Sequence, residues 1–297
     1  MASVPASGRT DALARHRARR APALAEFTRR HPTMAAGICI LLGLLICALA
    51  APLIVDKDPI AIDVVNRLNP PSDGQAFGTD HMGRSVLSRT IYGSRISLLV
   101  GFTVALLATV IGLAVGLLTG FFRWIDIVVM RVMDGLMAIP SVLLAIAFMA
   151  LAGSSVRNII VAITIPEVPR VARLVRGIVM SVREQPFVEA AIAAGSPDRK
   201  VLVKHILPTT ITPLVVQATY IAASAIIAEA YLSFLGAGAP PEIPSWGNIV
   251  AEGRALFTVA PWTVLFPSIF LALTVLAVNV VGDGLRDQLD PQMARRM

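Results

Sequence analysis

Few residues of this chain have the type and spacing that catalysis or metal binding requires. The four histidines are His16, His31, His81 and His205. They lie in polar or boundary segments, without the ligand spacing of a metal site. The sequence contains no G-x-x-x-x-G-K-S/T segment to hold nucleotide phosphates. We therefore expect no catalytic group, cofactor or metal ion in this chain.

Glu229 is the one ionisable residue deep within an otherwise apolar run. It lies 21 residues after Pro208, which on a helix is about 31 Å along the axis. Because the apolar core of a bilayer is about 30 Å thick, the carboxylate is expected near the outer interface. This depth argues against a proton relay, and we expect a structural or gating contact at the outer end.

The longest internal polar stretch on the side expected to be cytoplasmic, at about 178–206, has the pattern of a helix outside the bilayer. Pro186 can open a helix, and Glu189 then lies in an early turn, where the helix dipole favours an acid. Ala190 and Ala191 begin an alanine-rich stretch of high helix propensity and little side-chain bulk. Gly195 can adopt the left-handed conformation that ends a helix.

A second short helix is expected to follow within the same stretch. Ser196-Pro197-Asp198 can start it, Arg199 and Lys200 lie on it, and Pro208 marks the return to the membrane. A helix–turn–helix with a small-residue face lets the surface of another protein approach closely. The periodicity alone fits an ordinary loop between spanning helices equally well.

The elements that position these residues must be apolar helices. Of the 297 residues, 56% are hydrophobic and only 15% charged, against roughly 25% charged residues in soluble proteins. Uncharged runs of about 18 residues or more predict spanning helices. We expect six spans, the fourth being the least apolar, at about 34–55, 96–119, 128–151, 158–178, 207–236 and 261–283.

The basic residues indicate how these spans are oriented. Six spans place both termini on one side of the membrane, and most of the 26 Lys and Arg residues fall on that side. The positive-inside bias therefore predicts cytoplasmic termini and a solvated basic tail at 1–33. It also accounts for the net charge of +7 without nucleic-acid binding.

Several residues predict how the spans pack. Gly112, Gly116 and Gly120 lie on one face of a helix and favour close packing within the bundle over homodimerisation. Pro140 is expected to kink the third span, where Arg131 and Asp134 can form an i, i+3 ion pair. In addition, Trp246 and Trp262 are expected to anchor the outer interface.

The polar stretch also resembles a known family. Glu189-Ala190-Ala191, Gly195 and Leu207-Pro208 match the EAA motif of bacterial importer-type ABC permeases. His205 departs from the usual aliphatic residue of that motif, and His-Ile-Leu-Pro is typical of the peptide-transporter branch. Further segments resemble the C-type subunit of the dipeptide/oligopeptide and nickel group, and the resemblance covers about 34–292. These segments are 78–89, 172–177, 228–236, 244–247 and 282–291.

The resemblance implies an all-α integral membrane protein with six transmembrane helices, the importer-type ABC permease fold and a cytoplasmic coupling helix. The coupling helix of this family docks into a groove on an ATP-binding subunit. The motif assigns this contact to Glu189, Ala190, Ala191, Gly195, Ser196, Asp198, Arg199, Leu207 and Pro208.

The implied protein is a permease subunit in the bacterial inner membrane that forms half of a peptide translocation path. Its implied partners are a second homologous permease subunit, two ATP-binding subunits that hold ATP and magnesium, and an extracytoplasmic substrate-binding protein. The implied organisation is a basic tail at 1–33, a first span with an outer segment at 34–95, and the permease domain at 96–292.

Three questions stay open at this point. Nickel is the alternative substrate within the same group. A secondary transporter is less favoured, because it requires ionisable residues near the bilayer midplane, where they are sparse here. Glu229 could also form a site for the amino group of a peptide.

Overall fold

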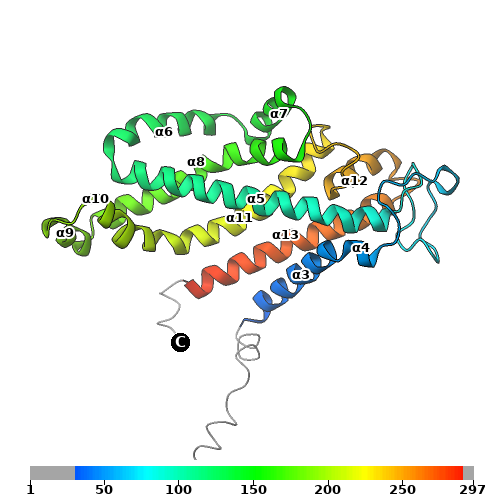
Figure 1. Ribbon diagram of the computed structural model, residues 1–297, viewed down its shortest axis with the longest axis horizontal. Helices are drawn as coiled ribbons and strands as arrows, with labels where there is room; N and C mark the ends of the chain where they lie inside the picture. Colours follow the sequence, from blue (N-terminus) through cyan, green and yellow to red (C-terminus); the bar gives the residue numbers. More distant parts are fainter. Residues whose placement is uncertain (1–30, 290–297) are drawn as a thin grey trace, which may run out of the picture.

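The computed structural model describes residues 31–289, whose regular structure is helical (Figure 1). Nearly all of the basic tail expected at 1–33 lies outside the described residues, as do residues 290–292 of the expected permease domain. The helices are α3 (Pro32–Leu49), α4 (Ala51–Ile54), η1 (Val64–Asn66), α5 (Val86–Phe121), α6 (Arg123–Ala138), α7 (Ser141–Ala152), α8 (Val156–Arg183), α9 (Pro186–Ala193), α10 (Asp198–Lys200), η2 (Val201–Ile206), α11 (Leu207–Phe234), α12 (Trp246–Gly253), η3 (Arg254–Leu256) and α13 (Trp262–Leu289).

Within residues 31–289, four helices are long and apolar enough to cross a membrane: α3, α5, the continuous helix Asp198–Phe234, and α13. A fifth candidate is the pair α6 and α7, which are bent by 91° at a short break. Helix α8 does not qualify as a candidate; Glu167, Arg170 and Arg173 interrupt its apolar sequence. The structure therefore gives an all-helical membrane protein with four to five candidate spans.

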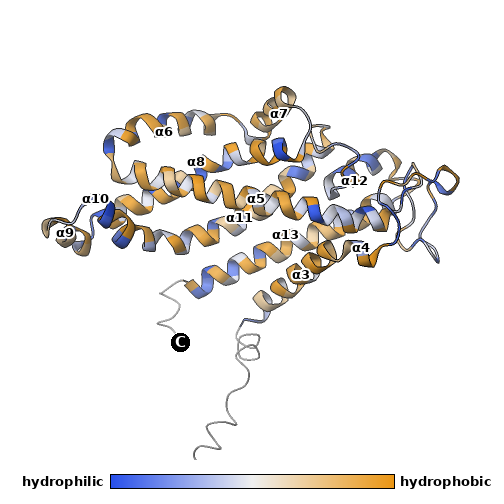
Figure 2. Cartoon of the chain, in the orientation of Figure 1, coloured by the Kyte–Doolittle hydropathy of each residue, from blue (hydrophilic) through white to orange (hydrophobic). Residues whose placement is uncertain are grey.

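The long helices form a bundle in which α5, α8 and α11 contact one another (Figure 1). Helices α3 and α13 pack together along one side of it, and α6 with α7 lies on the other. Helices α9 and α10 lie at one end, whereas α12 and the loop between α4 and α5 lie at the opposite end. Apolar residues dominate α3, α5, α11 and α13, whereas hydrophilic ones lie at the two ends of the bundle and along α6 and α8 (Figure 2).

Close packing of α5 on α8 depends on the glycines of α5. A Cβ atom added at Gly116 would lie 2.6 Å from the Cβ of Val175 and 2.7 Å from the carbonyl oxygen of Ala172. Gly112 and Gly120 meet α8 in the same way, one near Val171 and the other near Val179. The prediction that this glycine face packs within the bundle is confirmed, since a side chain there would push the two helices apart.

The break near Pro140 is larger than a kink. Helix α6 ends at Ala138 and α7 begins at Ser141, so the expected third span is two helices. The prediction that Asp134 pairs with Arg131 is wrong. Asp134 instead forms an ion pair with Arg173 of α8, at 2.6 Å. Sequence spacing favoured the nearest basic residue, whereas the packing of α6 beside α8 brought a distant one closer.

The two tryptophans differ in burial, but both donate hydrogen bonds within the fold. Trp246 is fully buried, and its indole nitrogen donates to the carbonyl of Thr90 at 3.0 Å. Trp262 is partly buried and donates to the carbonyl of Thr79 at 3.0 Å. The prediction of an interfacial anchor is therefore wrong for Trp246, whose side chain the fold encloses. For Trp262, which is partly buried, it stays a prediction.

Candidate functional site

Helix α9 begins and ends at the residues that the sequence indicated. Pro186 occupies its first turn, together with Glu189. Gly195 has a φ of +77°. Its N–H donates to the carbonyl of Ile192 at 2.9 Å, and the N–H of Ser196 donates to the carbonyl of Ala191 at 3.1 Å. These two bonds form a Schellman motif, which satisfies the last carbonyls of the helix and turns the chain sharply.

Most of α9 is uncovered. Val188 is its single buried residue, whereas Phe187 is 49% exposed and Ile192 46% exposed. Glu189 and Ala190 are exposed, and the second half of the segment presents Asp198 and Arg199 to solvent. Large apolar side chains flanked by charges on an exposed helix are typical of a protein–protein contact.

The segment continues into α11 without a break. Helix α10 leads into the π-helical stretch η2, and the N–H of Leu207 donates to the carbonyl of Leu202, five residues earlier. Leu207 is partly buried, and Pro208 is exposed in the first turn of α11. The expected boundary at Pro208 is therefore a change of helix type and not an interruption. Because the helix is continuous, a displacement of α10 reaches α11 directly.

A second connection runs from the start of α9 to the bundle. Arg183, the last residue of α8, donates to the carbonyl of Phe121 at 2.9 Å and lies over its ring, 5.3 Å from the centroid. Beside this contact is a pocket of about 590 Å³ with both polar and apolar lining. Its lining comprises Thr119, Gly120, Arg123, Asp126, Met180, Arg183, Glu184, Glu189 and Ile192.

Glu229 lies far from this segment, in the opposite half of α11. Its side chain is fully buried and accepts hydrogen bonds from Ser245 at 2.7 Å, Ser233 at 2.9 Å and Ser97 at 3.4 Å. These hydroxyls come from α5, α11 and the residue that caps α12. Three donors from three elements stabilise a buried carboxylate that has no cationic partner among them.

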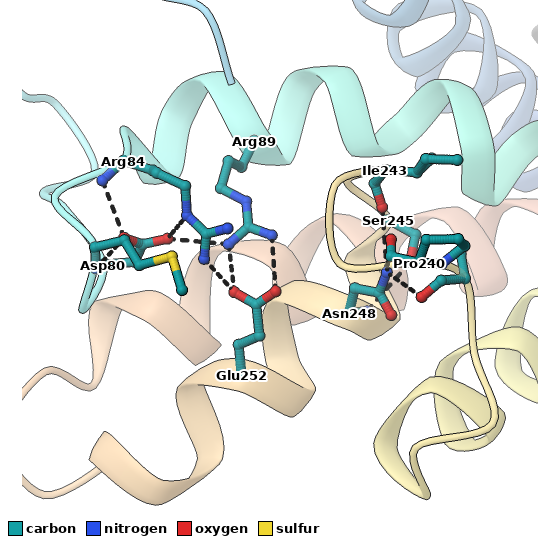
Figure 3. Close-up of polar contacts among 10 residues, drawn as sticks. Asp80, Arg84, Arg89, Pro240, Ile243, Ser245, Asn248 and Glu252 are labelled. Atoms are coloured by element: carbon teal, nitrogen blue, oxygen red, sulfur yellow. Dashed lines mark hydrogen bonds and ion pairs between the residues drawn. The ribbon is translucent and has the colours of Figure 1, made fainter. Parts of the chain in front are cut away.

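Two of these serines also hold the first turn of α12. The hydroxyl of Ser97 accepts from the N–H of Trp246 at 3.2 Å, and that of Ser245 accepts from the N–H of Asn248 at 3.1 Å. Each hydroxyl thus accepts from the backbone and donates to Glu229. Asn248 in turn donates to the carbonyls of Pro240 and Ile243, which fixes the loop before α12 (Figure 3).

A second buried network, which we call the outer ion-pair network, comprises Asp80, Arg84, Arg89 and Glu252 (Figure 3). Arg89 contacts Asp80 at 3.0 Å and Glu252 at 2.6 Å, and Arg84 pairs with both acids as well. Burial opposes ionisation of both carboxyls, but the two guanidinium groups outweigh it and lower the pKa of Asp80 and of Glu252. The network joins the loop before α5, and the first turn of α5, to α12.

Possible metal ligands also meet in this network. Oxygen or nitrogen atoms of Asp80, His81 and Glu252 lie within 4.8 Å of one another. The donors of Arg84 and Arg89 already contact both carboxylates and supply positive charge there. The chemistry of this group therefore fits an ion-pair cluster better than a metal site.

The structure thus brings Glu189 to Arg199 together at one end of the bundle and places Glu229 towards the other. Sequence reasoning missed the outer ion-pair network. Asp80, Arg84 and Arg89 lie within ten residues of one another, but Glu252 is 168 residues from Arg84. No local pattern connects Glu252 to the other three. The lone Glu229 was recognised from its apolar surroundings, but its three serine partners were not.

Comparison with known proteins agrees with this architecture. Residues 85–295 match the family described as "Binding-protein-dependent transport system inner membrane component". A protein of Sinorhizobium fredii named "Probable peptide ABC transporter permease protein" is 51% identical over 91% of this chain and 93% of its own length. A dipeptide transport system permease protein of Alkalihalophilus pseudofirmus is 43% identical over 86% of this chain and 85% of its own length.

A solved structure shares the fold at lower identity. A chain of the inward-facing MetNI methionine ABC transporter superposes with a TM-score of 0.54 at 22% identity. The match covers 69% of this chain and 96% of the other. It supports the importer-type permease fold for the helical bundle described above.

Proposed function

This chain belongs to the family of binding-protein-dependent transport system inner membrane components, and on that premise we propose that it forms half of the translocation path of a peptide importer. As a family member it is a multi-pass permease component of an ABC transporter. The peptide substrate is supported by the names of relatives that match along nearly their whole length. Nickel, the alternative within the same group, has no such support among these relatives.

The observation that carries the mechanism is the exposed helix α9 with its sharp end at Gly195. We assign the contact with an ATP-binding subunit to Glu189, Ala190, Ala191, Gly195, Ser196, Asp198, Arg199, Leu207 and Pro208. Apart from Leu207, which is partly buried, these residues have small or exposed side chains that leave room for a partner surface. Nucleotide-driven motion of the partner would move α9 and α10, and the continuous helix through η2 would carry that motion into α11.

The remaining partners complete the proposed assembly. A second homologous permease subunit forms the other half of the path, and two ATP-binding subunits hold ATP and magnesium. A substrate-binding protein delivers peptide at the outer end, near α12 and the loop before α5. Nucleic acid has no role in this proposal.

We further propose six spans in place of the four to five candidates. In this arrangement α6 with α7 is one broken span, and α8 is a span whose charges face other protein groups or water. Both termini are then cytoplasmic, as the distribution of Lys and Arg predicts. The proposed organisation remains a basic tail at 1–33, a first span with an outer segment at 34–95, and the permease domain at 96–292.

Substitution of Gly195 tests the coupling assignment. An added Cβ meets no atom within 4 Å, so Gly195→Asp adds a charge to the exposed turn together with the strain of a positive φ. Reconstituted with its partners, this variant should lose most peptide uptake and the ATP hydrolysis stimulated by the binding protein.

Gly153→Asp is the matched control at the other end of the bundle. Gly153 has a φ of +81° and equally open surroundings, so it bears the same strain and the same charge. Stimulated ATP hydrolysis should survive in this variant. Equal activity of the two variants, or purification of the wild-type chain without an ATPase, would refute the coupling assignment.

A further inference from the structure

Three ion pairs line the side of α8 that faces away from α5. Arg176 pairs with Asp126 of α6 through two bonds of 2.5 and 2.7 Å, and Arg173 pairs with Asp134 of α6 at 2.6 Å. Arg170 pairs with Glu167 on α8 itself at 2.7 Å. We call these six residues the α8 ladder. Its arginines recur every third residue, so they form one stripe along the helix.

The opposite side of α8 is apolar and packed. Val171, Val175 and Val179 are fully buried and meet the glycine face of α5. Helix α6 has no buried residue, and it touches α8 across the ladder. Helix α8 therefore separates a packed apolar side from a charged side that α6 leaves partly open.

The ladder is charged and partly exposed, and in the six-span arrangement proposed above it lies at membrane depth. Measured along α8 from Val156, it extends from about 17 to about 30 Å, which is the middle part of a helix about 42 Å long. Within it, the side chains of Arg173 and Asp134 are 50% and 56% exposed. Half-exposed charges at this depth are unfavourable against lipid, and they indicate a water-filled cavity or the path of a polar solute.

We propose that the α8 ladder is a polar wall of the translocation path, and that Asp134 and Arg173 exchange their mutual ion pair for the charged termini of a peptide in transit. This inference rests on the proposed function. A free peptide carries an ammonium group and a carboxylate at neutral pH. Asp134 can accept from the ammonium group, and the guanidinium group of Arg173 can donate to the carboxylate.

The exposure of the side chains in the three pairs identifies the ion pair that opens to bind the peptide termini. In the Arg176–Asp126 pair, which is bidentate, the side chains are only 28% and 20% exposed. In the Arg170–Glu167 pair, the side chain of Arg170 is 49% exposed but that of Glu167 only 9%. Within the ladder, only the Asp134–Arg173 pair has both side chains at least half exposed. The other two pairs hold α6 and the wall in place.

The test uses the complete transporter in proteoliposomes, supplied with peptide-loaded binding protein. Uptake of one peptide is compared with uptake of its N-acetylated and C-amidated forms, each normalised to the loaded fraction of the binding protein. Asp134→Asn should lower uptake of the free peptide about tenfold or more, and Arg173→Gln should do the same, since a hydrogen bond to a charged group is worth that much. Asp134→Asn should leave uptake of the N-acetylated form unchanged, and Arg173→Gln that of the C-amidated form.

Two further variants separate recognition from structure. Arg131→Gln removes an exposed charge from α6 outside the ladder and should change uptake of no form. Arg173→Cys in the assembled complex should react with a membrane-impermeant thiol reagent, and a transported peptide should slow the reaction.

The outcomes discriminate between the explanations. An equal loss for free and blocked peptides assigns the pair a structural role and overturns the inference. If the reagent cannot reach the thiol of the Arg173→Cys variant, the ladder lies at a contact between subunits, and the inference is overturned as well. A wild-type complex that imports no peptide refutes the proposed function itself, whereas normal wild-type import without selective losses in the variants refutes only the ladder.

Discussion

The two ends of the helical bundle differ in whether their charged side chains are buried or exposed. At the end with α12, Arg89 is 1% exposed and Glu229 is fully buried, and each is held by partners from other elements. At the end with α9, Glu189 and Arg199 face solvent, and Val188 is the only buried residue of the helix. One end satisfies its polar groups within the chain, whereas the other leaves its charges in solvent, as the proposed contact with an ATP-binding subunit requires.

This difference has a physical cause. A buried charge without partners is strongly unfavourable, so the α12 end must satisfy its carboxylates within the chain. The α9 segment lies outside the bundle, where water can satisfy its charges until a partner replaces the water. We therefore expect substitutions at the α12 end to change stability, and substitutions in α9 to change association.

Removal of Arg89 should have the largest effect on stability. Arg89→Met leaves Asp80 and Glu252 with one cation in a buried site, so the free energy of unfolding should fall by about 3–5 kcal/mol. Thermal unfolding in detergent measures the change. Arg199→Met, in the exposed segment, should leave the melting temperature unchanged, and equal shifts in the two variants would contradict the comparison.

Removal of the Glu229 carboxylate should have the next largest effect. Glu229→Ala leaves the hydroxyls of Ser97, Ser233 and Ser245 without their acceptor, so stability should fall by about 1–3 kcal/mol. A double-mutant cycle with Ser245→Ala should show coupling, because both changes break one contact. Additive effects would indicate that Glu229 does not hold α12 through Ser245. Glu229→Gln should test a substrate role separately, since unchanged uptake of charged and neutral peptides excludes a site for the amino group.

Acid should weaken the α12 end by a smaller amount, because the packing around the outer ion-pair network remains. The folded-state pKa values of Asp80 and Glu252 lie below those of ordinary carboxyl groups. The stability that these groups contribute is therefore present above the usual carboxyl range, and it is lost as the pH falls through the lowered values. Unfolding temperatures measured from pH 7 into the acid range should decline more for the wild type than for Asp80→Asn. Parallel declines would show that Asp80 contributes no pH dependence.

Two neighbouring residues of α9 should give the smallest changes in stability and the clearest contrast in function. Val188→Ala removes buried apolar surface and should lower stability by about 1–2 kcal/mol. Phe187→Ala changes a half-exposed ring and should alter stability by at most about 0.5 kcal/mol. The amount of ATP-binding subunit that co-purifies should nevertheless fall more in Phe187→Ala than in Val188→Ala. Retention of the subunit by that variant would remove Phe187 from the contact surface.

Much of the architecture was already determined by the sequence, because its cause is local. Uncharged runs located α3, α5, α11 and α13, although α5 begins ten residues earlier than expected, at Val86. Pro186 and Gly195 set the two ends of α9 through backbone conformation alone. The glycines of α5 predicted a close helix contact, since the absence of a side chain is a property of the residue itself.

Tertiary structure alone decided which distant groups meet. The break at Pro140 turned one expected span into two helices, and α8 carries too many charges for hydropathy to identify it as a span. Asp134 found Arg173 and not Arg131, and Trp246 became a buried donor. Local propensity depends only on the few residues around a position in the sequence. Ion pairs and buried hydrogen bonds instead depend on which helices pack side by side. For this reason the ends of α9 were visible in the sequence, but the outer ion-pair network and the α8 ladder were not.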